Sequence, residues 1–349
     1  MLRRLSPTAL QIRPTTCEAN NAEHATSFLP GKDDIMRILV TGARGKVGAA
    51  TIHRLLRSDH EVTAVDIAPP VYERTREVRY LQADLADAGH TAAVVPGHDA
   101  VVHAAAIASP VKNPPHVIFQ NNVMSTYNVI EAAERAGVSR VVHLSSETVP
   151  GFCYPTRYFH AAFAPIDEGH RVAPQDSYAL SKSLGEALMD AAVARRDMTG
   201  LSIRPTWVQW EGNIERNLGP VIRARGEDKS ASLWSYIIVY DLADLLALAV
   251  TADLPAGHEV LYAAAADNAN GLPLHDLVRR HFGNRVELRL VTRPDASGIS
   301  CAKAIRLLGW KPTRSWHEWL DDDGYMRAEV QELVIAGRTG LQQALRAVS

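Results

Sequence analysis

From Arg37 onward the chain alternates short β-branched runs with longer stretches of helical spacing. Runs that predict strands cover residues 37–40, 61–65, 79–82, 100–103, 140–144 and 201–204. Apolar residues spaced for helices cover residues 47–57, 121–136 and 175–195. Strands that alternate with helices in this way are typical of a parallel sheet with helices on both faces. The pattern therefore predicts an α/β protein with a doubly wound parallel sheet.

After the last of these strands the pattern becomes irregular. It predicts a short strand at Glu259–Ala263 and short helices at Leu274–Phe282 and Ala302–Leu308. These elements indicate a smaller lobe that covers one edge of the sheet. We therefore divide the chain into a sheet domain at residues 36–205 and a region at residues 206–349 that is mainly the smaller lobe and C-terminal helices.

The beginning of the chain has a different composition, with scattered Pro, Thr, Asn and Ser and no sustained apolar period. We interpret residues 1–35 as a flexible leader. Arg3, Arg4 and Arg13 precede the first acidic residue, Glu18, which is typical of an organelle transit peptide. An upstream start codon or an unstructured tail is the favoured alternative, so we expect a cytoplasmic protein and leave organelle targeting open.

Composition and charge exclude several classes of protein. Lys and Arg number 37 and Asp and Glu 39 in 349 residues, and the net charge of −2 gives no electrostatic basis for binding nucleic acid or an anionic membrane. The longest apolar runs are far shorter than the roughly 18 residues that span a bilayer. The three cysteines lack Cys-x-x-Cys spacing and the 14 histidines lack His-Glu-x-x-His spacing, so we expect neither a disulfide framework nor a metal site. A small molecule is the expected partner.

Three glycines lie between the first predicted strand and the first predicted helix, in the sequence Thr41-Gly42-Ala43-Arg44-Gly45-Lys46-Val47-Gly48. Gly42 suits a tight turn, Gly45 lets the backbone approach a pyrophosphate, and Gly48 lets the helix pack closely on the strand. Free N–H groups at the start of the helix attract an anion. This context predicts a dinucleotide site of the Rossmann type.

Asp66 ends the second predicted strand, where a carboxylate accepts hydrogen bonds from an adenosine ribose and repels a 2′-phosphate. Arg44 in the glycine turn favours the opposite preference, because a guanidinium pairs with a 2′-phosphate. We weigh Asp66 more heavily, since it penalises NADP whereas Arg44 only permits it. NAD is the expected cofactor, and NADP stays open.

Hydroxyl groups and an amine follow at two further positions. Ser145 and Ser146 come at the carboxyl end of the fifth predicted strand, where open α/β sheets bind ligands. Tyr178 and Lys182 lie four residues apart in a predicted helix and therefore project from one face. A free phenol has a pKa of about 10, so it acts as a base at neutral pH only beside a group such as the Lys182 ammonium. Lys182 can supply that charge to Tyr178.

In this order along the chain, the motifs resemble those of the extended short-chain dehydrogenases/reductases, and specifically the NAD-dependent epimerase/dehydratase family. The resemblance covers about Met36 to Leu320. The glycine turn matches Thr-Gly-x-x-Gly-x-x-Gly, and other family motifs resemble Ala83-Asp84-Leu85, His103-Ala104-Ala105-Ala106, Asn121-Asn122-Val123 and the segment from Ser300 to Pro312. The resemblance implies a Rossmann-like doubly wound parallel sheet with a smaller C-terminal substrate-binding lobe. It leaves a homodimer open.

The resemblance also implies a role for each motif. Tyr178 exchanges a proton with the substrate hydroxyl, Lys182 holds the nicotinamide ribose as well, and Ser146 hydrogen-bonds the forming carbonyl. Hydride moves between the substrate carbon and nicotinamide C4. The expected cofactor contacts are Gly42, Arg44, Gly45, Lys46, Val47, Gly48, Asp66, Asp84, Leu85, Ala104, Ala105, Ala106, Asn121, Tyr178, Lys182 and Pro205.

Several positions depart from the family pattern. Glu147 and Thr148 stand where dehydratases carry an Asp-Glu pair, so elimination of water is disfavoured. The segment from Pro205 to Trp210 lacks the Asn and Gly-Pro pattern of many nucleotide-sugar enzymes, which argues against a nucleotide sugar. The aromatic loop at residues 151–160 is equally consistent with a cover over the substrate and with a surface loop. Candidates for the same pocket, with core packing as the alternative, are Trp207, Trp210, Arg216, Trp234, Ser235 and Tyr236.

Three functions remain. The first is an NAD(P)-dependent oxidoreductase that acts on a secondary alcohol or ketone of a sugar or polyol-like molecule. A sugar or nucleotide-sugar epimerase, similar to UDP-galactose 4-epimerase, would use the same residues. A non-catalytic NAD(P)-sensing protein on the same fold is the third alternative, although such relatives often lose the Tyr or the Lys and this chain keeps both.

Overall fold

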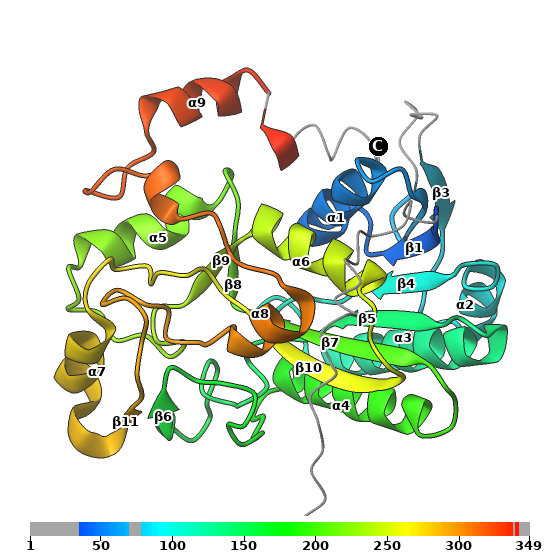
Figure 1. The fold of residues 1–349 in the computed structure, drawn as a ribbon, viewed down its shortest axis with the longest axis horizontal. Coiled ribbons are helices and arrows are strands. Elements are labelled where there is room, and N and C mark those ends of the chain that lie inside the picture. The colour runs from blue at the N-terminus through cyan, green and yellow to red at the C-terminus, as the bar shows by residue number, and fades with distance from the viewer. Residues whose placement is uncertain (1–34, 70–77, 338, 342–349) are drawn as a thin grey trace, which may run out of the picture. The chain divides into compact units, whose positions relative to one another are not determined.

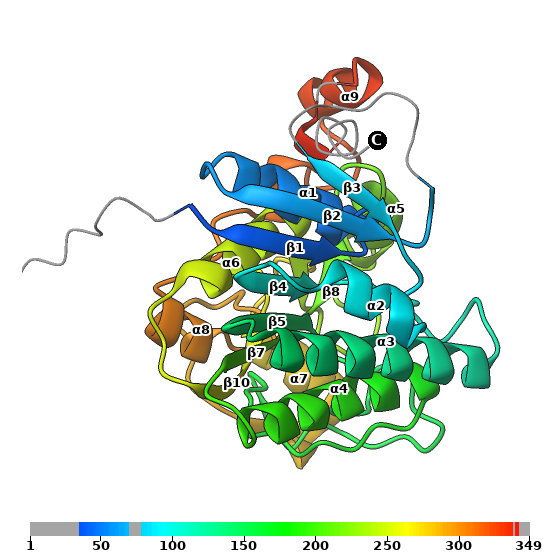
Figure 2. The same cartoon turned by 90° about the vertical axis from the view of Figure 1, so that its right-hand side faces the viewer.

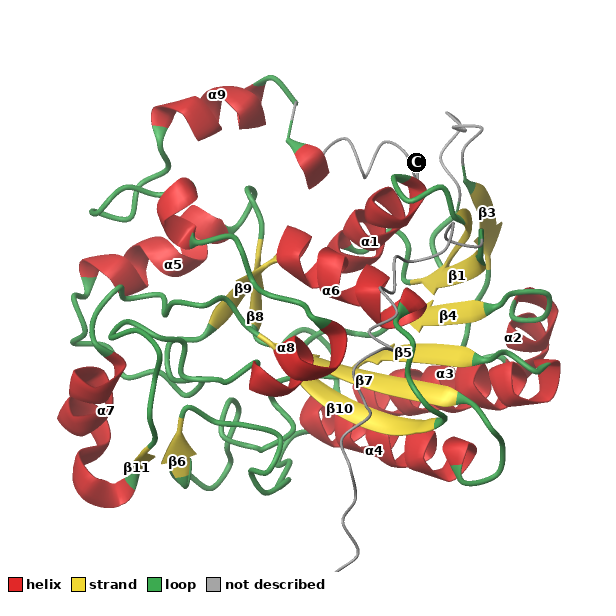
Figure 3. Cartoon of the chain, in the orientation of Figure 1, coloured by secondary structure: helices red, strands yellow, loops and turns green. Residues whose placement is uncertain are grey.

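The computed structural model describes residues 35–69, 78–337 and 339–341. The leader expected at residues 1–35 lies, except for its last residue, outside the described residues. In the described part, one large parallel sheet lies between helices, and shorter elements gather beside the carboxyl ends of its strands (Figures 1 and 3).

The main sheet has seven parallel strands in the order β10-β7-β5-β4-β1-β2-β3. Their bounds are β1 Arg37–Thr41, β2 Glu61–Asp66, β3 Arg79–Gln82, β4 Ala100–His103, β5 Arg140–Leu144, β7 Thr199–Pro205 and β10 Gly257–Ala263. All the strands predicted for the sheet domain are present. The chain moves outward in one direction from β1 through β2 to β3, and in the other direction from β4. Ligands of such sheets bind where the order reverses, here between β1 and β4.

Alternate residues of the central strands face two helical layers (Figure 2). On β1, Ile38 and Val40 belong to the core beneath one layer, whereas Leu39 belongs to the core beneath the other. This double burial explains the unbroken apolar sequence of the strand. One layer holds α1 (Lys46–Leu56) and α6 (Val239–Thr251), and the other holds α2 (Ala88–Val94), α3 (Pro115–Ala136) and α4 (Ser177–Val193).

The helix predicted at residues 121–136 starts six residues earlier than expected, as 121 − 115 = 6. Pro115 occupies the first helical position of α3, where a missing N–H costs nothing and the fixed φ suits the helix. Gly137 ends the helix with φ +72°, as its place after the last apolar residue predicted.

Shorter elements make up most of the chain after β7. β6 (Phe163–Ala164) pairs with β11 (Glu287–Leu288), and β8 (Trp207–Gln209) pairs with β9 (Tyr236–Ile238). The remaining described elements are α5 (Ile214–Arg223), α7 (Leu274–Phe282), α8 (Ala302–Leu308), α9 (Ala328–Ile335) and 3-10 turns at Gly283–Arg285 and Trp316–Glu318. The two short helices predicted in this region are confirmed at both ends.

The strand predicted at Glu259–Ala263 is present, but its assignment to the smaller lobe is wrong. It forms most of β10, which pairs with β7 at the edge of the main sheet. Residues 36–205 therefore do not contain the whole sheet domain. Strand β10 and helix α6, which covers the sheet, come from the part of the chain after residue 205. A short apolar run does not reveal which sheet it will join.

A buried ion pair fixes α4 to the sheet. Arg204 on β7 donates from Nε and Nη2 to the two carboxylate oxygens of Glu186 on α4, each at 2.7 Å. Ser145 Oγ donates to Glu186 Oε1 at 2.6 Å. The side chains of Arg204 and Glu186 are only 3% and 10% exposed. Each charge of such a pair depends on the other, because water cannot replace the missing partner.

Replacement of Glu186 by alanine should lower the free energy of unfolding by about 3–5 kcal/mol, because the Arg204 charge stays buried without its partner. Urea denaturation measures this change. The control is Asp323→Ala, which removes a pair with Arg225 that is about 70% exposed on both sides and should cost about 0–1 kcal/mol. Equal losses in the two variants would contradict the role of the buried pair.

Candidate active site

The glycine turn brings α1 and the loop after β4 into backbone contact. Gly42 has φ +66°, in the left-handed region, and a Cβ there would lie 2.7 Å from Ala105 N. A Cβ on Gly48 would lie 2.2 Å from Gly42 O, so the helix fits against the turn only without a side chain. α1 begins at Lys46, and its N-cap Gly45 offers no side chain to the first N–H groups. These groups are therefore available to an anion.

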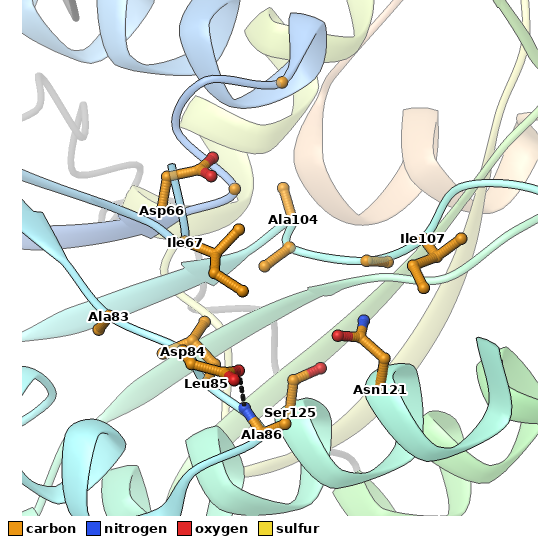
Figure 4. A pocket seen from close by; sticks show the side chains of 14 residues that line it. Asp66, Ile67, Ala83, Asp84, Leu85, Ala86, Ala104, Ile107, Asn121 and Ser125 are labelled. Carbon is orange, nitrogen blue, oxygen red and sulfur yellow. Dashed lines mark hydrogen bonds between the residues drawn. The ribbon is translucent and has the colours of Figure 1, made fainter. Parts of the chain in front are cut away.

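A cleft runs along the carboxyl ends of β1 to β4 (Figure 4). The residues expected at the cofactor that line it are Gly42, Gly45, Asp66, Asp84, Leu85, Ala104, Ala105, Ala106 and Asn121. Further lining residues, which were not among the expected cofactor contacts, are Ile67, Ala83, Ala86, Ile107 and Ser125. Expected residues outside this lining are Arg44, Lys46, Val47, Gly48, Tyr178, Lys182 and Pro205. The cleft thus joins segments far apart in the sequence, as a bound dinucleotide requires.

Two of the unexpected lining residues carried a signal in the sequence. Ser125 follows Asn121 by four residues on α3, so the two share one helical face. Ile67 directly follows Asp66 and is 63% exposed although it is apolar. Ile67 therefore offers an exposed apolar side chain to the cleft, beside the acid that is expected at the ribose.

Asp66 faces the cleft in an orientation fixed by the backbone. Its Oδ2 accepts from Arg44 N at 2.9 Å and its Oδ1 accepts from Ala68 N at 3.0 Å. The Arg44 guanidinium donates to Pro69 O at 3.3 Å, and Arg44 is not part of the cleft lining. A carboxylate rather than a guanidinium therefore faces the cleft. This arrangement supports the expectation that Asp66, rather than Arg44, decides the preference for NAD over NADP.

Buried hydrogen bonds position the loop after β4. Asn122 Oδ1 accepts from Ile107 N at 2.8 Å, and its Nδ2 donates to Ile107 O at 3.1 Å. Thr41 Oγ1 accepts from Ala105 N at 3.2 Å and hydrogen-bonds with His103 Nδ1 at 2.9 Å. Burial lowers the pKa of His103 to about 3, so its ring is neutral at pH 7. The second Asn of the Asn-Asn-Val motif is thus a positioning residue, while the first lines the cleft.

Tyr178 and Ser146 come together at the carboxyl end of β5. Asp176 Oδ1 accepts from Tyr178 N at 2.9 Å, which places Tyr178 in the first turn of α4. Ser146 Oγ accepts from the N and Oγ1 of Thr148 at 3.2 and 3.0 Å. Burial raises the pKa of Tyr178 to about 12, and its hydrogen bond with Ser146 partly offsets the rise. The hydroxyl of Ser146 is therefore close enough to Tyr178 to affect its pKa, and the phenol is protonated at neutral pH.

Lys182 is buried one turn along α4 from Tyr178. Its Nζ donates to Leu144 O at 2.6 Å and lies 5.9 Å from the centre of the Tyr178 ring. Burial lowers the pKa of Lys182 to about 8, against the opposing field of Glu186. The ammonium is directed to the Leu144 carbonyl, and Ser146 lowers the pKa of Tyr178 against the effect of burial.

A second cavity lies in the smaller lobe. Among the residues expected at a substrate pocket, Trp207, Trp234 and Ser235 line it, and Trp210, Arg216 and Tyr236 do not. Lys229 is a further lining residue, and its Nζ lies 4.1 Å from the centre of the Tyr158 ring. The aromatic loop at residues 151–160 therefore contacts a side chain of this cavity, which favours a place at the substrate side over a free surface loop.

Among the residues that the structure describes, no group of three or more His, Cys, Asp or Glu side chains is arranged to hold a metal ion. Among the helices described here, none is both long and apolar enough to cross a membrane. Cys153 and Cys301 are free thiols.

A glycine turn at the end of β1, an acid at the end of β2 and a Ser, Tyr and Lys around β5 define a Rossmann-fold protein of the extended short-chain dehydrogenase/reductase type. The model of the NAD dependent epimerase/dehydratase family matches residues 38–261. The chain belongs to this family. The match confirms the resemblance and the fold class.

Similar proteins include several with named activities. The chain is 38% identical over 122 residues to 3 beta-hydroxysteroid dehydrogenase/Delta 5→4-isomerase of Mycobacterium tuberculosis. The aligned region covers 33% of this chain and 33% of that relative. It is 33% identical to L-arabinose 1-dehydrogenase (NAD(P)(+)) of Haloferax volcanii over 49% of this chain and 67% of the relative. It is 26% identical to UDP-glucose 4-epimerase of Bacillus subtilis over 84% of this chain and 100% of the relative. A structure of a mutated uronate dehydrogenase has a TM-score of 0.59 at 27% identity and covers 81% of this chain and 85% of that one.

NAD should bind more tightly than NADP by roughly tenfold or more, about 1.4 kcal/mol, because Asp66 would face the 2′-phosphate of NADP. Calorimetric titration with both cofactors measures the difference. Asp66→Ser should narrow or reverse the preference, and Arg44→Ala added to that variant should weaken NADP binding specifically. Tighter binding of NADP by the wild type would show that Arg44 sets the specificity.

Proposed function

We propose that the protein is an NAD-dependent oxidoreductase that acts on a secondary alcohol or ketone of a sugar or polyol-like molecule. The observation that carries the proposal is the meeting of Ser146, Tyr178 and Lys182 at the carboxyl edge of the sheet that also bears the glycine cleft. The sugar dehydrogenases among the similar proteins support the substrate class.

Each side chain has a part in the proposed reaction. The Tyr178 phenolate takes the proton of the substrate hydroxyl during oxidation, and the phenol so formed returns the proton during reduction. Ser146, which is close enough to Tyr178 to lower its pKa, holds the substrate oxygen together with it. Lys182 supplies a buried positive charge that stabilises the phenolate as it forms. NAD, when bound, supplies the acceptor for the hydride that leaves the substrate carbon.

An epimerase is the second candidate, because the similarity to UDP-glucose 4-epimerase covers the whole of that relative. An epimerase oxidises and re-reduces the same substrate and releases no NADH. The test is incubation of the purified protein with NAD and a panel of sugars, with NADH absorbance and product chromatography followed together. Formation of NADH in the same molar amount as the oxidised sugar supports the oxidoreductase. Isomerised sugar without NADH would support the epimerase, and neither product would contradict both.

Tyr178→Phe should lower kcat by at least about a hundredfold and leave the affinity for NAD nearly unchanged, because only the transferred proton is lost. Lys182→Ala should lower kcat and weaken NAD binding, since the ammonium serves both. Steady-state kinetics and calorimetric titration of NAD separate the two effects. Wild-type kcat in Tyr178→Phe would exclude the proposed base.

The proposal includes a cytoplasmic homodimer that forms through α3 and α4. These helices pack side by side and expose the apolar side chains of Val117, Met124, Tyr127 and Leu180 by 38–43%. Such a patch on neighbouring helices favours association.

Tyr127→Glu should convert the dimer to a monomer, because it places a charge within the apolar patch. Size-exclusion chromatography with light scattering measures the mass. The control is Leu333→Glu, which changes a comparably exposed leucine on α9 and should leave the mass unchanged. A monomeric wild type would contradict this part of the proposal.

A further inference from the structure

Glu147 is a buried carboxyl group that the proposed chemistry does not use. It follows Ser146 directly and is only 8% exposed. Its Oε2 has no hydrogen-bond partner among the residues that the structure describes. Buried polar groups are normally paired, because water cannot satisfy them. The unpartnered oxygen therefore indicates a group that comes from outside the described chain.

The position of Glu147 is at the catalytic end of the sheet. Its backbone N donates to Pro205 O at 3.1 Å, which holds it against the end of β7. The backbone N–H of Trp207, a residue that lines the second cavity, is close enough to the carboxyl group to lower its pKa. A negative charge on this carboxyl group would raise the pKa of Tyr178 and Tyr154. The carboxyl group is therefore near both a residue of the cavity in the smaller lobe and the phenol of Tyr178.

A structural role does not account for this carboxyl group. Thr148 donates its hydroxyl to Ser146 rather than to Glu147. The buried guanidinium nearby, Arg204, is already neutralised by Glu186. No part of the described fold thus requires the free oxygen of Glu147.

The surroundings of the Glu147 carboxyl group favour its neutral form, because a buried charge without a paired cation is costly. Burial raises the pKa of Glu147 well above its usual range, and the opposing effect comes from the Trp207 N–H rather than from a cation. In its neutral form the group has one O–H to donate. A negative charge at this place would also hinder the ionisation of Tyr178 that the reaction needs.

We propose that Glu147 donates a hydrogen bond to a hydroxyl or ring oxygen of an uncharged sugar, beside the carbon that reacts, and that it disfavours sugar acids. The inference rests on the proposed function and names its substrate class. A neutral sugar oxygen accepts this bond without bringing a charge into the buried site. A substrate carboxylate would need a cation there, and Lys182, the cation beside Tyr178, is directed to Leu144 O.

The experiment compares D-galactose with D-galacturonate, which differ only in the neutral or acidic group at C6, and includes L-arabinose as a second uncharged sugar. The readout is kcat/KM for NAD-dependent oxidation. The wild type should prefer the uncharged sugars by at least about tenfold, since one lost hydrogen bond in a buried site has about this effect. Glu147→Ala should lower kcat/KM for the uncharged sugars by about tenfold and reduce the preference. Glu147→Gln, which keeps a donor of similar size, should stay within about threefold of the wild type.

The matched control is Glu211→Gln, which changes a buried glutamate that accepts from Tyr240 Oη at 3.1 Å, away from this cluster. It should leave the sugar preference unchanged. All variants should keep the wild-type affinity for NAD and its unfolding midpoint. Preference of the wild type for galacturonate, or an unchanged preference in Glu147→Ala, would overturn the inference and leave the proposed function standing. NADH formation from neither kind of sugar would overturn the proposed function and the inference together.

Discussion

The Glu186 carboxylate connects α4, β5 and β7, the three elements that position the catalytic groups. It accepts from Arg204 at the end of β7 and from Ser145 at the end of β5, while it lies on α4 itself. Ser145 precedes Ser146 in the chain, and Lys182 lies one turn before Glu186. A single buried interaction therefore sets the distance between the serine of one strand and the tyrosine and lysine of the helix. Because both charges are buried, a shift of α4 would separate opposite charges in a medium of low dielectric constant.

The cofactor end of the sheet could be predicted from the sequence to a large extent. Gly42, Gly45 and Asp66 are recognisable because backbone contact and ribose binding allow few residue types at those places. The positions of the strands could also be predicted from the sequence, because strands buried on both faces have near-continuous apolar runs. Backbone contact, ribose binding and burial on both faces each restrict the residue types at consecutive positions, so a local stretch of sequence reveals them.

Other features arise only when distant segments meet, so no local pattern contains them. β10 joins the main sheet through its pairing with β7, more than fifty residues earlier in the chain, as 257 − 199 = 58. The partnership of Glu186 with Arg204 depends on how α4 packs on the sheet, and the sequence shows only an acid in a helix and a base in a strand. The hydrogen bond of Asn122 with Ile107 likewise depends on the path of the loop after β4.

Burial also reverses the order in which Tyr178 and Lys182 lose protons. In water the two groups have nearly equal pKa values, about 10 for tyrosine and 10.4 for lysine. In the fold burial raises the pKa of Tyr178 to about 12 and lowers that of Lys182 to about 8, because each loses solvation of its charged form. The resting site therefore contains a neutral phenol, which is the form that gives a proton to a carbonyl. Oxidation requires the opposite form, so groups that reach Tyr178 must stabilise a negative charge on it.

The two buried glutamates Glu186 and Glu147 differ in how they affect the formation of a negative charge on Tyr178. Both carboxylate oxygens of Glu186 accept from the Arg204 guanidinium, which balances the charge of this glutamate. Glu147 has no cation beside it, so an ionised form would place an uncompensated negative charge near the phenol. The site tolerates an acid at this position only while it is neutral, and a neutral acid can donate a hydrogen bond. The same burial that makes Glu147 costly for the fold thus makes it suitable for binding an uncharged, oxygen-rich substrate.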